Sequence, residues 1–140
     1  MSHFTTIRTV IRDRETLCEA LRHLHREFRV GENLTVRGYQ GRTEQADIVV
    51  PTGCAYDIGF RRESDQTYGA VADWDWGIKR EASPQFQREA FLQQVNQAYA
   101  RCGLVQQATV HGYVIEEERV LPNGEIELVV SEAMNQESNP

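Results

Sequence analysis

The sequence predicts an α+β fold of the ferredoxin-like kind: a single, mostly antiparallel sheet with two helices packed on one of its faces. Two segments, 14–28 and 84–103, each carry one apolar stripe at helical spacing. Most other apolar segments alternate with a period of two, which is typical of strands with one buried face. Turn-forming residues between them indicate hairpins, so the expected order is β-α-β-β-β-β-α-β-β.

The first third of the chain accounts for one helix and three strands. Residues 4–11 are dense in Thr, Ile and Val, which favours a strand. Asp13 is suited to cap a following helix. The apolar stripe of that helix consists of Leu17, Ala20, Leu21, Leu24 and Phe28. Gly31-Glu32-Asn33 should end the helix, and two short strands are expected over 34–39 and 46–50.

The central segment is expected to form a β-hairpin. On both sides of a polar turn at 63–66, apolar residues alternate with polar or small ones. The length of the turn leaves two registers open, and a shift by one residue exchanges the two faces of a strand. In one register Asp57 and Asp73 lie across from each other on one face; in the other, Asp73 lies beside Tyr56.

The last third predicts a helix and a closing pair of strands. Ser83-Pro84 is a strong helix start, and Gly103 is well placed to cap its end. The buried stripe of this helix consists of Phe91, Val95, Ala98, Tyr99 and Cys102. Residues 104–115 are expected to form a strand containing His111, and Asn123-Gly124 suits a type I′ turn before a strand over 126–130. We expect residues 1–134 to form a single domain and 135–140 a frayed tail.

Composition excludes several broad classes. The 140-residue chain has a net charge of −6, which argues against general binding to nucleic acids or anionic membranes. No apolar run approaches the roughly 20 residues of a membrane span, and no secretory signal pattern opens the chain, so a cytoplasmic or stromal location is expected. Three widely spaced cysteines without a C-x-x-C motif are expected to be reduced and buried.

Several segments carry a resemblance to a known family. They are Met1-Ser2-His3-Phe4, Val36-Arg37-Gly38-Tyr39-Gln40-Gly41, Ala46-Asp47-Ile48-Val49-Val50, Tyr56-Asp57-Ile58-Gly59-Phe60 and 68–74. With Gly103 and Asn123-Gly124, the chain resembles over nearly its whole length the family of the hypothetical chloroplast reading frame thirty-five of algal plastids and cyanobacteria, also catalogued as domain of unknown function twelve fifty-seven. The resemblance implies a soluble protein without an assigned reaction, stromal in plastid relatives. It carries over no catalytic residue.

The most prominent candidate site is Asp73-Trp74-Asp75-Trp76. If the strand continues through it, both aspartates face one way and both tryptophans the other, giving an acidic rim beside an aromatic anchor. The alternative is that one tryptophan closes the end of the sheet while the acids face water.

Arginines suggest a second candidate site. Arg37 and Tyr39, together with Arg42, Arg61 and Arg62, either form an anion-binding patch or are solvated residues at strand edges.

The same residues leave few options for metal binding or catalysis. Asp57, Asp73 and Asp75 could bind Mg²⁺ or Ca²⁺, but EF-hand spacing and a phosphate loop are both absent from the sequence. We therefore expect neither a metal nor a cofactor. No common catalytic motif occurs, so the sequence is weighted against an enzyme while leaving the question open.

The leading functional hypothesis is a non-catalytic binding or accessory module. It would dock a protein partner through an exposed sheet edge or through the end of the sheet that carries Trp74 and Trp76. The alternative is a small enzyme or ligand sensor with a pocket between sheet and helices, using Arg37, Asp57 and Asp73. Assembly into a homo-oligomer through a sheet edge, or into a larger complex, is a third hypothesis.

Overall fold

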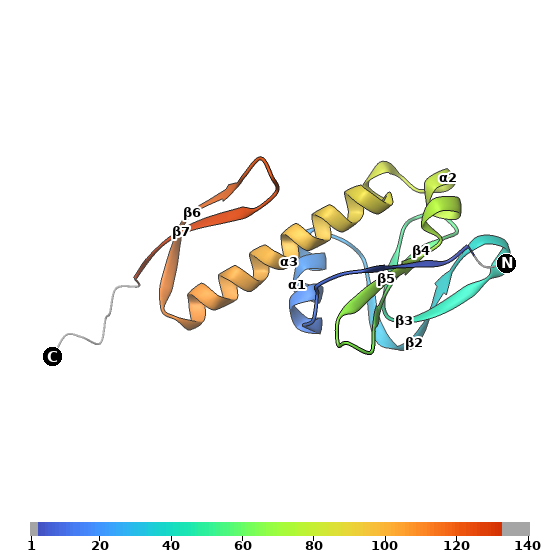
Figure 1. Cartoon of the computed structure of the whole chain (residues 1–140), viewed down its shortest axis with the longest axis horizontal. Coiled ribbons are helices and arrows are strands. Elements are labelled where there is room, and N and C mark those ends of the chain that lie inside the picture. The colour runs from blue at the N-terminus through green and yellow to red at the C-terminus, as the bar shows by residue number, and fades with distance from the viewer. Residues whose placement is uncertain (1–2, 133–140) are drawn as a thin grey trace.

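The computed structural model describes residues 3–132, which form a five-stranded sheet, two long helices and a separate two-stranded sheet (Figure 1). The strands are β1 (Thr5–Arg8), β2 (Arg29–Arg37), β3 (Thr43–Pro51), β4 (Asp57–Arg62), β5 (Tyr68–Ala72), β6 (Tyr113–Val120) and β7 (Ile126–Glu132). The helices are α1 (Arg14–His23), the short α2 (Lys79–Glu81) and α3 (Arg88–Val110). The structure also has three single helical turns, η1 (Tyr39–Gly41), η2 (Trp74–Ile78) and η3 (Pro84–Phe86). The predicted tail, 135–140, lies outside the described residues.

The larger sheet has the strand order β1-β5-β4-β3-β2, and every neighbouring pair is antiparallel. The predicted central hairpin is therefore confirmed as β4-β5. Its register pairs Gly59 with Val71 and Phe60 with Ala70. Continued to the end of the hairpin, this register sets Asp57 across from Asp73, which is the first of the two alternatives that the sequence left open.

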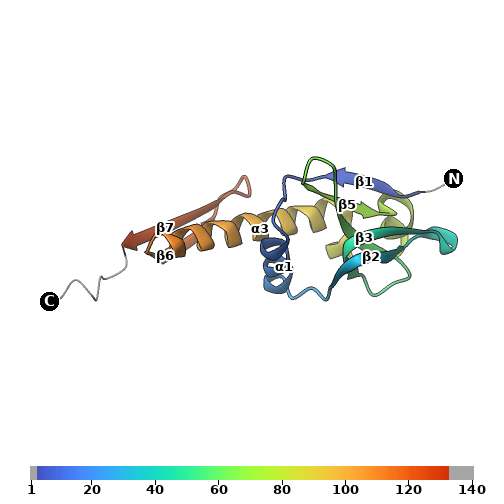
Figure 2. The ribbon, with the colours of Figure 1, turned by 90° about the horizontal axis from the view of Figure 1, so that it is seen from below.

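Both long helices cover one face of this sheet, as predicted. Alternate residues of β3, β4 and β5 point to that face and meet the apolar stripes of α1 and α3. The two helices pack against each other and cross at a steep angle (Figure 2). The shared core includes Leu17, Leu21, Ile48, Ile58, Phe60, Ala70, Phe91 and Val95. One core is therefore common to both helices and the sheet.

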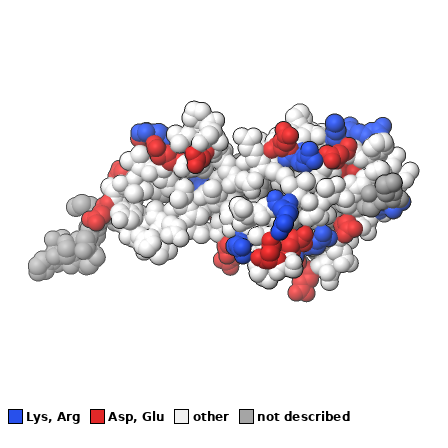
Figure 3. All heavy atoms as spheres, in the orientation of Figure 1, with Lys and Arg blue, Asp and Glu red and all other residues white. Residues whose placement is uncertain are grey.

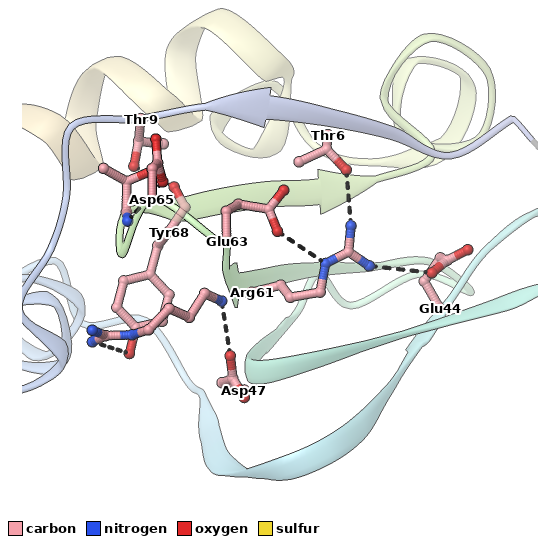
Figure 4. Close-up of polar contacts among 10 residues, drawn as sticks. Thr6, Thr9, Glu44, Asp47, Arg61, Glu63, Asp65 and Tyr68 are labelled. Atoms are coloured by element: carbon pink, nitrogen blue, oxygen red, sulfur yellow. Dashed lines mark hydrogen bonds and ion pairs between the residues drawn. The ribbon is translucent and has the colours of Figure 1, made fainter.

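At one end of the sheet, a small apolar cluster covers the opposite face. Gly59 permits a close approach there, because a Cβ atom would lie 2.5 Å from Cγ2 of Val36. Phe4, just before β1, packs against Gly38, which follows β2 at the other edge of the sheet. The side chain of Phe4 therefore reaches across this face from one edge of the sheet to the end of the other edge strand. The remainder of this face is polar, with Arg61 reaching Glu44, Glu63 and Thr6 (Figure 4).

The first helix is shorter than predicted. α1 ends at His23, not at residue 28, and His25 adopts a left-handed φ of 57°. The change of direction lets β2 begin at Arg29, well before the strand expected over 34–39. Phe28, assigned to the helical stripe, still packs against the core, but from the connection rather than from the helix.

The second helix is longer than predicted. The prediction that Gly103 caps it is wrong, because α3 continues through Gly103 to Val110. The left-handed residue that ends it is Gly112, with a φ of 78°. Residues 104–110 are thus helical rather than a strand, and His111 is the exposed C-cap residue. At the other end, Ser83-Pro84 starts η3, and α3 begins only at Arg88.

The prediction of a single sheet is also wrong, because β6 and β7 form their own sheet. Residues 104–110 carry the chain about 10 Å beyond the expected helix end, at 1.5 Å per residue, so the following strands do not reach the larger sheet. They fold back along the far half of α3 (Figure 1). The ferredoxin-like arrangement is not confirmed. What the structure shows is a mixed fold with a mostly antiparallel sheet.

The turn between β6 and β7 differs in type from the prediction. The N–H of Gly124 donates to the carbonyl of Leu121 over 2.8 Å, so Pro122 and Asn123 are the two central residues. Of the turn residues only Gly124 has a positive φ, 86°, whereas a type I′ turn needs two. Proline fixes a negative φ, which excludes a type I′ turn at that position. No helix among residues 3–132 is long and apolar enough to span a membrane.

Candidate functional site

An aromatic cluster lies where the start of the chain, η1 and η2 meet. His3 stacks on Trp76 with ring centroids 5.1 Å apart and planes 9° from parallel. Tyr39 meets both rings edge-on, at 5.5 Å from His3 and 5.7 Å from Trp76. The guanidinium carbon of Arg80 lies 4.6 Å from the indole centroid, at cation–π distance. We call His3, Tyr39, Trp76 and Arg80 the aromatic platform.

A buried carboxylate holds the platform in place. Asp73 is only 1% exposed, and its two oxygens accept from the backbone N–H of Tyr39 and of Gly77, each over 3.0 Å. One side chain thus joins η1 to η2. Gly77 is needed here, because a Cβ atom would lie 2.7 Å from the ring of Tyr56. The backbone below Trp76 is therefore fixed by hydrogen bonds and by packing.

A second buried carboxylate fixes the end of β2. Asp57 accepts from the backbone N–H of Arg37 over 2.9 Å, and from Nε and Nη2 of its guanidinium, each over 2.8 Å. The hydrogen bond with Asp57 raises the pKa of Arg37. Because the fork of arginine matches a carboxylate, this pair sets the direction in which the chain enters η1.

The expected alternation along residues 73–76 is wrong. The strand ends at Ala72, and Trp74–Ile78 form a π-type turn in which Ile78 N–H donates to the carbonyl of Asp73. Residues two apart on a helical turn point in nearly opposite directions, so the two tryptophans separate. Trp74 is sealed in the core, whereas Trp76 is 38% exposed.

The two aspartates separate as well. Asp73 is buried, but the side chain of Asp75 is 65% exposed and forms an ion pair with Arg88 over 3.3 Å. No acidic rim therefore forms beside the indoles. Of the two interpretations of residues 73–76, the structure agrees better with the second, in which one tryptophan closes the end of the sheet. Of the two acids, Asp75 faces water and Asp73 does not.

The candidate arginines fall into two groups. Arg37 and Arg42 line a shallow hollow of about 330 Å³ beside Tyr56. Arg61 lies on the polar face of the sheet, paired with acids (Figure 4). The guanidinium carbon of Arg62 lies 4.7 Å from the centroid of the Tyr68 ring. The five predicted residues do not form one basic patch.

The cysteines have different environments. Cys18 and Cys102 are buried, and burial raises the pKa of both thiols. Cys54 is only half-buried, with its sulfur 3.0 Å from the hydroxyl of Thr52. In the part of the chain that the structure describes, all three cysteines are free and no three His, Cys, Asp or Glu residues are grouped to hold a metal ion.

The structure thus brings most of the predicted residues together, but in roles that alternation did not indicate. Asp57 and Asp73 are internal supports, and Tyr39 and Trp76 are the surface that they support. Sequence reasoning missed His3 and Arg80. Arg80 follows Trp76 by four residues, the spacing of side-chain neighbours on a helix, and would have been found had a helical turn been expected there.

Comparison with known proteins places the chain in a family. The family model described as "Protein of unknown function (DUF1257)" matches residues 20–129. The chain is 33% identical over 135 residues to "Uncharacterized protein ycf35" of Guillardia theta, with 93% of this chain and 96% of that protein covered. It is 30% identical over 130 residues, with the same coverage, to the protein of that name in Cyanophora paradoxa. No solved structure matches significantly. The chain therefore belongs to the DUF1257 family, as its resemblance to that family predicted.

Proposed function

We propose that this protein is a non-catalytic binding module that docks a partner protein through the aromatic platform. One observation carries the proposal: Trp76 keeps 38% of its surface exposed although it lies on a backbone held by a buried carboxylate. A tryptophan that only filled the core would be sealed, as Trp74 is. Trp76 is instead held at the surface.

The composition of the platform fits a protein interface. Tryptophan, tyrosine and arginine are the residues most enriched at the energetic centres of such interfaces. His3, Tyr39 and Arg80 already order the indole by direct contact, so its docking costs little further side-chain entropy. Charged residues are close to Trp76 in sequence, since Asp75 precedes it and α2 consists of Lys79, Arg80 and Glu81, and blue spheres gather at that end of the molecule (Figure 3). An aromatic centre with polar residues around it is the usual anatomy of a docking surface.

The geometry gives less support to the alternative function, an enzyme or ligand sensor that uses Arg37, Asp57 and Asp73. Such a site needs carboxylates that face a cavity shared with the ligand. Here both carboxylates are buried and accept hydrogen bonds from the protein's own backbone. We therefore favour docking, in the cytoplasmic or stromal location expected from the sequence.

Capture of partners by the full chain tests the proposal. The tag belongs at the C-terminus, because His3 is part of the platform. Truncating a central interface tryptophan costs about 2 kcal/mol or more, roughly 30-fold in affinity. Trp76→Ala should therefore lose at least one partner that wild type retains in lysate of the source organism, measured by quantitative mass spectrometry.

Val10→Ala is the matched control, because it truncates an exposed apolar side chain outside the platform. It should retain every partner. If Trp76→Ala is folded by circular dichroism and still captures all partners at wild-type levels, the platform is not the docking surface.

A further inference from the structure

The far half of α3 and the β6-β7 hairpin form an arm, residues 103–132, that projects from the body (Figures 1 and 2). Most exposed large apolar side chains of the described residues lie on it. They are Leu104, Val110, Tyr113, Val114, Val120, Val129 and Val130. In Figure 3 much of the visible arm surface is uncharged. Such a concentration of exposed apolar surface marks an interaction site.

The hairpin is also an incomplete sheet. Within residues 3–132, β6 pairs only with β7, so each strand has an outer edge without a backbone partner. One helix covers one face: Arg101 of α3 forms an ion pair with Glu118, and Gln97 donates to the carbonyl of Gly124. Unpaired strand edges are where proteins add a strand from another chain.

The side chains of β7 are complementary to a second copy of β7. An antiparallel pair with its two-fold axis at Val129 uses all seven residues of the strand. Leu128 then faces Val130 of the other copy, Glu127 faces Ser131, and the two copies of Val129 face each other. No glutamate lies directly across from another glutamate.

The outer edge of β6 lacks this complementarity. Its centre is Glu116-Glu117-Glu118, and an antiparallel self-pairing with its axis at Glu116 or Glu117 places a glutamate against its own copy. Like charges directly across a strand pair are destabilising. Self-association is therefore favoured at β7 rather than at β6.

We infer that two copies of the chain pair through β7, antiparallel about Val129, to form a continuous four-stranded sheet. The axis runs perpendicular to this sheet, so both α3 helices cover the same face, the one that carries Leu128 and Val130. The opposite face brings the two copies of Val129 together. Three or more strands with an apolar face form a more stable unit than an isolated hairpin.

The charge of the arm allows salt dependence to distinguish this dimer from a complex with a basic partner. Residues 103–132 contain one arginine and six glutamates. Two such arms repel each other through water, and salt screens the repulsion. The dimer should therefore tighten as sodium chloride is raised from low to physiological concentration, whereas a complex with a basic partner would weaken.

Sedimentation velocity on the full chain tests the dimer, with the platform variant Trp76→Ala expected to dimerise as wild type does. Val129→Glu places like charges across the axis and should raise the dimer dissociation constant at least tenfold. Because Val129 lies across from Glu117 within the hairpin, both variants are made in a Glu117→Gln background. Val114→Glu is then the matched control: Val114 lies on the same uncovered face and is 46% exposed against 39% for Val129, but it belongs to β6. It should change the constant less than twofold.

Crosslinking tests the register. Cα atoms across an antiparallel pair lie about 4.5–5.5 Å apart, within disulfide range. In a Cys54→Ser background, Val129→Cys should form a covalent dimer under mild oxidation and Val114→Cys should not. A chain that stays monomeric at 100-micromolar concentration overturns the inference. So does a dimer that Val129→Glu leaves intact, that Val114→Glu weakens equally, or that Val129→Cys does not crosslink.

Discussion

Replacing Asp73 should destabilise the protein far more than replacing Asp75, two residues away. The carboxylate of Asp73 is buried and accepts from the backbone N–H of Tyr39 and Gly77. Without it, two donors that join η1 to η2 lose their acceptors inside the protein. Asp75 is exposed and forms an ion pair with Arg88.

The magnitudes follow from those contacts. A buried donor left without a partner costs about 1–3 kcal/mol, so Asp73→Ala should lower the free energy of unfolding by roughly 2–5 kcal/mol. Asp73→Asn keeps one acceptor oxygen and should lose about half as much. An exposed ion pair contributes about 0–1 kcal/mol, which bounds the effect of Asp75→Ala.

Urea unfolding followed by tryptophan fluorescence measures these differences as shifts in midpoint at constant slope. Acrylamide quenching in the native state adds a second readout. Loss of Asp73 should make Trp76 easier to quench, whereas Trp74 stays sealed. Equal stability of Asp73→Ala and Asp75→Ala, or unchanged quenching in Asp73→Ala, would show that Asp73 does not hold η1 to η2.

Three further predictions concern other parts of the fold. Gly59→Ala should lower the free energy of unfolding by about 1–3 kcal/mol in urea titrations, because its methyl group would press on Val36. Of the three thiols, only Cys54 should react quickly with Ellman's reagent, and Cys54→Ser should abolish the fast phase. Hydrogen bonds from Thr67 lower the pKa of Asp65 from 3.8 to about 2. The stability that its ionised form contributes is therefore complete above pH 3.8 and is lost as the pH falls toward 2, so Asp65→Asn should show a shallower fall in melting temperature across that window.

Local patterns predicted the elements whose signals are local. The β4-β5 hairpin, the two apolar helical stripes and the turn near Gly124 depend on residues close in sequence, and all three are present. The predicted end of α3, at Gly103, was wrong because a glycine ends a helix only where the chain takes a left-handed conformation. Gly103 has room for a Cβ atom and an ordinary helical backbone, whereas Gly112 has the positive φ. Composition does not distinguish these two glycines.

The position of Trp76 depends on contacts that a local pattern does not contain. Whether residues 73–76 continue a strand or form a turn is decided by Asp73, whose hydrogen bond to Tyr39 spans 34 residues. As a strand, the segment would place both indoles on one face; as a turn held by a buried carboxylate, it seals Trp74 and exposes Trp76. If the platform is the docking surface, its geometry therefore depends on Asp73. Asp73→Asn should then weaken partner capture even though it changes no platform residue, and Asp75→Asn, closer to the indole in sequence, should not.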